Sequence, residues 1–91
     1  MTDDWDDVSY VISSRYRVAT LERLQTGPAT PSRIATDTDL SIAHISRALQ
    51  ELQEEELVTL LVSEERRKGR VYGTTDQGQS VIETIQAEKM V

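Results

Sequence analysis

The sequence predicts a small α+β domain that is mainly helical and carries one β-hairpin. Three observations support this fold class: apolar residues recur every three or four positions along most of the chain, helix-capping residues precede these segments, and two strand-like runs flank a polar turn. The 91 residues suffice for one domain with one modest core. We expect an acidic N-terminal segment with a short helix at 1–12, and the main part of the domain at 13–91.

Apolar residues near the N-terminus recur at helical spacing, and they are Trp5, Val8, Ile12, Tyr16 and Ala19. Ser13 and Ser14 interrupt this pattern, and serine favours N-cap positions because its hydroxyl accepts a bond from a free backbone amide. We therefore predict one helix near residues 4–12 and a second near 14–26. The second helix is expected to turn Val18, Leu21 and Leu24 inward.

Two further helices are predicted to be joined by a tight turn. Thr30 and Pro31 mark the start of the first, because threonine caps a free amide and proline suits the first helical turn. Asp and Thr at 37–39 favour a turn, and Ser41 caps the next helix. The apolar stripe of that helix is Ile45, Leu49 and Leu52. With the second helix over 41–55, this is a helix-turn-helix pattern.

A β-hairpin and a closing helix follow. Residues 57–62 and 71–74 read as strands, and the polar stretch 63–70 between them, which contains Gly69, reads as the turn. Thr75 caps a last helix, whose apolar face is Val81, Ile82 and Ile85. Four of the ten basic residues lie in the hairpin turn, and they are Arg66, Arg67, Lys68 and Arg70. We call residues 63–70 the wing.

In order and length, five stretches are typical of one family: SSRYRVATLERL, TPSRIA, LSIAHISRALQELQEEELV, ERRKGRVY and TTDQGQSVIETI. Together they cover most of residues 13–85, and the chain resembles winged helix-turn-helix transcription regulators of the ArsR and MarR kind, especially small archaeal ones. The resemblance implies a winged helix-turn-helix with flanking N- and C-terminal helices. It also implies a sequence-specific regulator of transcription that binds double-stranded DNA through a recognition helix at 41–55 and the wing.

Four residues depart from the family pattern. Thr38 and Thr74 replace apolar residues, whereas Asp39 and Glu56 stand where glycine is common. A side chain with a Cβ in the left-handed region costs about 1 kcal/mol, so these changes weaken the fold without refuting it. The chain has no cysteine, which argues against the thiolate metal sensing of ArsR relatives.

A recognition helix contacts base edges with its N-terminal half, and phosphates are contacted from the flanking segments. Arg47 is expected to donate two hydrogen bonds to guanine, and Ala43 to touch a thymine methyl group. These predictions have alternatives. Arg47 could instead form an ion pair with Glu51, one helical turn further on. The wing could be a solvated hairpin tip, and His44 could make no contact with DNA. The predicted DNA-binding residues are Thr30, Ser32, Arg33, Ser41, Ala43, His44, Ser46, Arg47, Gln50, Arg66, Arg67, Lys68 and Arg70.

Composition excludes several classes of protein. Without cysteine and with a single histidine, we expect no metal site and no cofactor. No apolar run approaches a membrane span, and an acidic N-terminus is unlike a signal peptide, so we expect a cytoplasmic protein. There is no glycine-rich phosphate loop and no recognisable catalytic pair, so we expect no enzymatic activity.

Charge is unevenly distributed. The formal net charge is −6, and Asp3, Asp4, Asp6 and Asp7 carry −4 of it. A surface rich in acids, with eight arginines and two lysines, is also what a protein adapted to a halophilic cytoplasm would carry. The acidic field favours an alternative function, a winged-helix module that binds protein in a transcription or replication assembly.

Apolar residues at both ends exceed what one small core needs, which suggests a homodimer. The alternative is that the terminal helices simply cover their own domain. The predicted dimer interface contains Trp5, Val8, Val11, Ile12, Ile85 and Met90. A dimer would place two recognition helices in successive major grooves, so we expect a repressor-like protein that acts by occupying a palindromic operator. The operator, the direction of regulation and any effector are open at this point.

Overall fold

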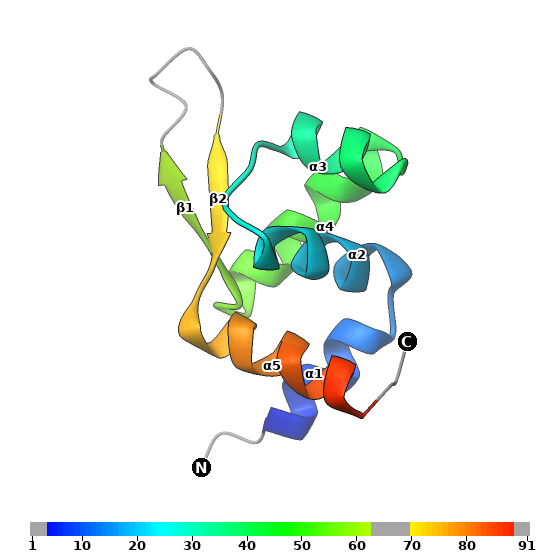
Figure 1. The fold of residues 1–91 in the computed structure, drawn as a ribbon, viewed down its shortest axis with the longest axis vertical. Helices are drawn as coiled ribbons and strands as arrows, with labels where there is room; N and C mark the ends of the chain where they lie inside the picture. Colours follow the sequence, from blue (N-terminus) through cyan, green and yellow to red (C-terminus); the bar gives the residue numbers. More distant parts are fainter. Residues whose placement is uncertain (1–3, 63–69, 89–91) are drawn as a thin grey trace.

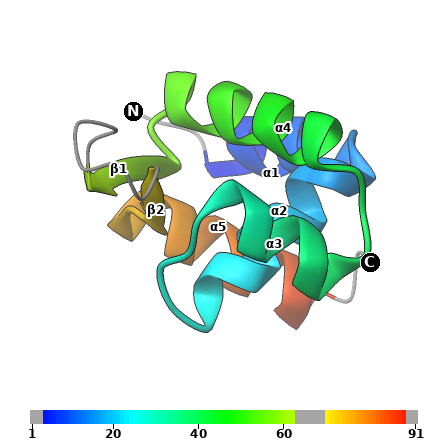
Figure 2. The same cartoon turned by 90° about the horizontal axis from the view of Figure 1, so that it is seen from above.

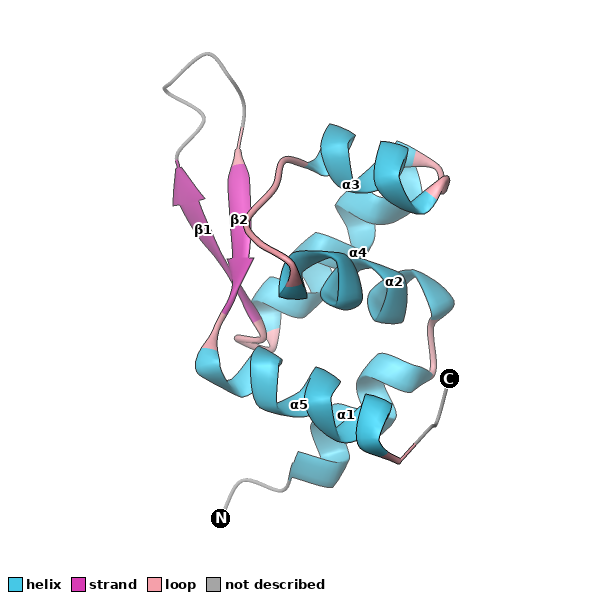
Figure 3. Cartoon of the chain, in the orientation of Figure 1, coloured by secondary structure: helices cyan, strands magenta, loops and turns pink. Residues whose placement is uncertain are grey.

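The computed structural model describes residues 4–62 and 70–88. Within them the elements are α1 (Asp4–Ile12), α2 (Arg15–Gln25), α3 (Pro31–Thr38), α4 (Ile42–Glu54), β1 (Val58–Val62), β2 (Val71–Thr74) and α5 (Asp76–Ala87). In Figure 1, α1 and α5 lie at the bottom, α3 lies at the top, and the hairpin runs along the left side. Figure 3 shows the same chain as a set of helices with one pair of strands, so the predicted mainly helical α+β fold is confirmed.

All four predicted N-caps are present. The side chains of Ser14, Thr30, Ser41 and Thr75 each accept a hydrogen bond from a backbone amide two or three residues further on. Local chemistry therefore starts these helices where the sequence indicated. The turn after α3 begins later than expected, because α3 continues to Thr38.

The N-terminal apolar stripe was predicted correctly at Val8 but not at Trp5 and Ile12. α1 buries Val8 and Val11, whereas Trp5 and Ile12 are 55% and 40% exposed. The reason is the break after Ile12: α1 ends there, so its inward face is set by packing on α5 and α2 and not by continuity with α2.

The hairpin is antiparallel, with Val58 opposite Thr74 and Leu60 opposite Tyr72. Tyr72 also exchanges two backbone hydrogen bonds with Ala29, at 2.9 and 3.0 Å. The segment between α2 and α3 therefore pairs with β2 from the other side. This pairing ties the base of the hairpin to the helix-turn-helix, and local sequence carried no signal for it.

One buried cluster joins all the helices to the hairpin. Its large, fully buried side chains are Val8, Val11, Leu21, Ile34, Ile45, Leu49, Leu52, Leu57, Val58, Val81, Ile82 and Ile85.

Glu56, just after α4, has φ 62, which confirms the expected left-handed residue at a position where glycine is common.

Within the described residues, no helix combines the length and the apolar character that a membrane span requires.

Candidate nucleic-acid interface

The turn between α3 and α4 depends on one left-handed residue. Asp39 has φ 60 and ψ 34, which is expected at a position where the resembling family often carries glycine. Half-buried Thr38 is accommodated because its hydroxyl donates to the Ile34 carbonyl at 2.7 Å. The Leu40 amide donates to the Ala35 carbonyl at 3.2 Å, and its side chain packs against the core. These contacts determine the direction in which α4 leaves the turn.

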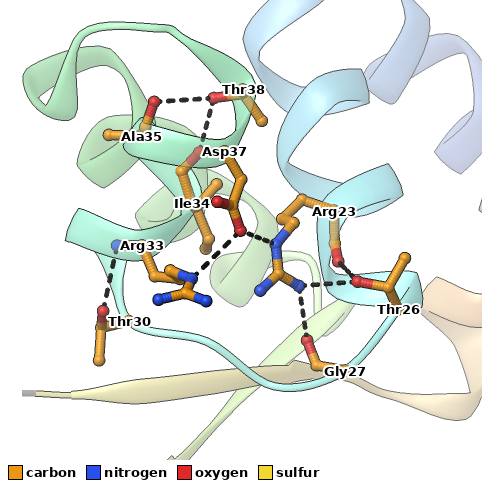
Figure 4. A network of polar contacts seen from close by, with 9 residues as sticks. All are labelled: Arg23, Thr26, Gly27, Thr30, Arg33, Ile34, Ala35, Asp37 and Thr38. Atoms are coloured by element: carbon orange, nitrogen blue, oxygen red, sulfur yellow. Dashed lines mark hydrogen bonds and ion pairs between the residues drawn. The ribbon is translucent and has the colours of Figure 1, made fainter.

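An ion-pair network holds α3 against the end of α2 (Figure 4). Arg23 Nε donates to Asp37 Oδ2 at 2.7 Å, and Arg33 Nε lies 3.4 Å from the same oxygen. Arg23 Nη1 also donates to Thr26 Oγ1 and to the Gly27 carbonyl. The hydrogen bond from Arg23, aided by the charge of Arg33, lowers the pKa of the Asp37 carboxyl. Arg33 keeps a side chain that is 68% exposed, so the ion pair leaves it accessible.

α4 has one buried and one exposed face, and Figure 2 shows it running along one side of the molecule. Ser41 caps it, accepting from the Ala43 amide at 3.2 Å. The stripe predicted to face the core is buried, together with Ala48. The residues predicted to face outward are all exposed, and they are Ser41, Ala43, His44, Ser46, Arg47 and Gln50.

A cleft of about 370 Å³ lies between α4, the start of α3 and the first half of β2. Ser46, Gln50 and Arg70, which the sequence assigned to DNA contact from two distant segments, line it together. Gln53 and Tyr72 also line the cleft, and neither was predicted. Helical spacing from Gln50 was a usable signal for Gln53, whereas Tyr72 enters only because β2 crosses this face.

The remaining phosphate-contact candidates are placed less uniformly. Ser32 is exposed at the start of α3, whereas the Thr30 hydroxyl is already engaged, accepting from the Arg33 amide at 3.2 Å. Arg70 is exposed at the start of β2. The wing residues Arg66, Arg67 and Lys68 lie outside the described residues.

Two side chains of α2 contact α4, and neither was assigned this role from the sequence. Tyr16 stacks on His44 with ring centroids 4.3 Å apart and planes 15° from parallel. Arg17 Nε donates to Glu51 Oε1 at 3.1 Å. The predicted alternative contact of Arg47 is also present, with its Nε 3.7 Å from Glu51 Oε2. Because α2 is far from α4 in sequence, no local pattern indicated these contacts.

The family model described as the HVO_A0261 N-terminal domain matches residues 5–89. The chain belongs to this family. Among curated proteins, none matches this sequence.

The fold of this chain is similar to those of solved MarR family proteins. The MarR family transcription regulator SP03579 is 29% identical, with a TM-score of 0.76 over 85% of this chain and 52% of that one. NMB1585, a MarR family regulator from Neisseria meningitidis, is 20% identical, with a TM-score of 0.72 over 85% and 55%. Zinc-responsive ZitR from Lactococcus lactis is 23% identical, with a TM-score of 0.71 over 85% and 54%. The chain thus spans about half the length of these regulators, and its resemblance to winged-helix proteins of the MarR kind is confirmed.

The structure corrects part of the predicted dimer interface. Val8, Val11 and Ile85 are at most 1% exposed, because α1 and α5 use them to cover the domain's own core. Trp5 and Ile12 are exposed, and Met90 lies outside the described residues.

In the described ranges 4–62 and 70–88, no group of three His, Asp or Glu side chains is placed to hold a metal ion.

Proposed function

We propose that this chain is the DNA-binding domain of a transcription regulator and that it contacts duplex DNA through α4 and the wing. The observation that carries the proposal is the cleft that Ser46 and Gln50 share with Arg70. It joins the exposed face of a capped helix to the last residue of the basic wing, which is the arrangement needed to span a major groove and its flanking phosphates. The similarity to MarR family regulators supports this role.

Six of the predicted residues on α3 and α4 have a defined part in this contact. Arg47, with its side chain 79% exposed, donates to guanine, and Ala43 lies against a thymine methyl group. Gln50 and Ser46 contact bases or phosphates at the margin of the cleft. Ser41 and Ser32 stand at helix N-termini, where the amide dipoles favour phosphate. Glu54, Glu55 and Glu56 lie at or just beyond the C-terminal end of α4, and this end of the helix leaves the groove.

The regulatory mode is occupancy of an operator by a homodimer in the cytoplasm, where bound protein blocks the transcription machinery. Trp5 and Ile12, both exposed on α1, are the apolar residues that a second copy covers. Ile12→Glu is expected to convert a dimer to a monomer, measured by size-exclusion chromatography with light scattering. A wild-type chain that already elutes as a monomer would overturn the dimer.

A second candidate function is recognition of a basic protein segment. An open cleft of about 710 Å³ lies between α5, β1 and the end of α4, and its lining includes Asp7, Glu55, Glu56 and Asp76. This face repels phosphate and would attract lysine or arginine side chains. Gln53 is the one described residue that lines both clefts, so variants at the other lining residues distinguish the two functions.

The test is a fluorescence-anisotropy titration of a duplex of about 30 base pairs, long enough for two half-sites one helical turn apart. It is repeated over a series of potassium chloride concentrations for the wild type and for the variant R66A/R67A/K68A/R70A. Each basic side chain of the wing that contacts a phosphate is expected to contribute about 0.9 to the slope of log affinity against log salt concentration. The variant should therefore bind more weakly and with a flatter slope.

Lys89→Ala is the control for the loss of one basic charge and is compared with Arg70→Ala. Only Arg70→Ala is expected to flatten the slope. Equal effects of the two variants would show that net charge, and not a contact made by the wing, governs binding. Absence of binding by folded wild-type protein at every salt concentration would reject the DNA-binding role and favour the acidic cleft as the functional face.

A further inference from the structure

Glu51 lies between two arginines in different surroundings. Its Oε1 accepts from Arg17 Nε at 3.1 Å, and its Oε2 lies 3.7 Å from Arg47 Nε. The Arg17 side chain is 15% exposed, whereas that of Arg47 is 79% exposed. One carboxylate therefore connects a largely buried guanidinium on α2 to the exposed arginine of α4.

Arg17 is held firmly from the other side. Its Nη1 donates to the Tyr10 carbonyl at 2.6 Å and to Ser13 Oγ at 2.9 Å. Its guanidinium also lies over the Tyr10 ring, 3.8 Å from the centroid. The Tyr10 carbonyl belongs to the last turn of α1, where carbonyls lack partners within the helix. With four interactions in place, Arg17 gives Glu51 a fixed position.

This arrangement restricts how Arg47 meets DNA. A carboxylate near Nε leaves the Nη1 and Nη2 groups of a guanidinium pointing outward, and bidentate recognition of guanine needs two such donors on one edge. The Glu51 carboxylate also offsets the positive charge of Arg47, which reduces the attraction of this side chain to the phosphates of DNA of any sequence. Both effects favour a base contact over a backbone contact.

We propose that Glu51, held in place by Arg17, is a positioning residue that determines the sequence specificity of Arg47. The proposal rests on the DNA-binding role proposed above and adds a residue that touches no base. It connects the α1–α2 junction to the base-contacting arginine through Arg17, Glu51 and Arg47.

The experiment begins with selection of preferred sites from a random duplex library by the wild type. Affinities for the selected site and for an unrelated duplex are then measured for the wild type and for R47A, E51Q and E54Q. Arg47→Ala should remove a preference of roughly 5- to 150-fold at one base pair, the discrimination of a good arginine–guanine contact. Glu51→Gln should reduce the same preference by about threefold to tenfold, which lies within the range for coupled neighbours.

Affinity for the unrelated duplex separates positioning from a general structural effect. Glu51→Gln removes a negative charge, so binding to this duplex should stay equal or become tighter while discrimination falls. Glu54→Gln removes the same charge one turn further along α4 at an exposed position, and should leave discrimination unchanged. If E51Q does not fold, the variant R17M/E51M, which replaces the pair by apolar side chains, is measured in its place.

The outcomes are distinct. Discrimination that is unchanged in E51Q, or that falls equally in E51Q and E54Q, overturns the role of Glu51 while leaving DNA binding intact. Discrimination that survives in R47A overturns the positioning role of Glu51 as well, because Arg47 would then contact no base. A wild type that binds no duplex rejects the proposed function itself, and the role of Glu51 with it.

Discussion

At the scale of single residues, Thr20 is the least favourable placement in the described core. It is fully buried in α2, and its hydroxyl has no hydrogen-bond partner among the described residues. A buried hydroxyl without a partner costs about 1–3 kcal/mol, and valine has nearly the same shape. Thr20→Val should therefore raise the free energy of unfolding by about 1 kcal/mol, measured by urea denaturation.

Thr38→Val is the matched control, because the Thr38 hydroxyl does donate to a backbone carbonyl. It should bring no gain in stability. A gain of the same size in both variants would mean that general hydrophobicity, and not the unpaired hydroxyl, accounts for the effect.

Asp37 makes stability depend on pH. Hydrogen bonding from Arg23 lowers the carboxyl pKa below its ordinary value of 3.8, so the unfolded chain binds the proton more tightly than the folded chain. The stability that the carboxylate contributes is complete above that ordinary value and is lost as pH falls through the lower folded pKa. Asp37→Asn should thus destabilise the protein at pH 7, measured by thermal denaturation. The difference from wild type should shrink as the pH falls below the ordinary value, and a constant difference would exclude this linkage.

At the scale of elements, the contact between α5 and the start of the hairpin depends on a glycine. Gly78 lies in the first turn of α5, and a Cβ there would overlap the Leu57 carbonyl, which is rigid backbone. Gly78→Ala should therefore destabilise the fold by about 1–3 kcal/mol, the typical cost of overpacking, even though alanine favours helices. Urea denaturation of this variant beside Ser80→Ala, at an exposed site on the same helix, tests it. Equal stabilities of the two variants would contradict the close contact.

Elements also differ in how far the sequence predicts them. The N-caps were predicted correctly because the cap bond spans two or three residues of one chain segment. The inward face of α1 was not, because α5 and α2 decide which side of that short helix is covered. The Ala29–Tyr72 pairing escaped prediction for the same reason, since its partners meet only after folding.

At the scale of the whole molecule, net charge predicts a response to salt. A chain of net charge −6 repels itself, and added potassium chloride screens that repulsion. The melting temperature should therefore rise from low salt to roughly 1 M, where the Debye length is about 3 Å. Calorimetry of the wild type measures this rise.

The variant D3N/D4N/D6N isolates the source of the charge effect. It halves the net charge and leaves Asp7, whose carboxylate accepts from Gln77 at 2.9 Å, in place. The rise of its melting temperature with salt should be smaller than in the wild type. An identical salt response would show that the N-terminal acids are not the cause.

The sequence by itself determined the fold class, the order and caps of the helices, the two left-handed residues and the outward face of α4. The fold class, the caps and the outward face follow from periodicity and capping, which act within a few residues. The left-handed residues Asp39 and Glu56 were expected because the resembling family carries glycine at these positions. Only the tertiary structure decided that Val8, Val11 and Ile85 belong to the core, that Arg70 shares a cleft with Gln50, and that Arg17 holds Glu51. Those contacts join positions far apart in the chain, and which side chains meet across such distances depends on how all the elements pack together.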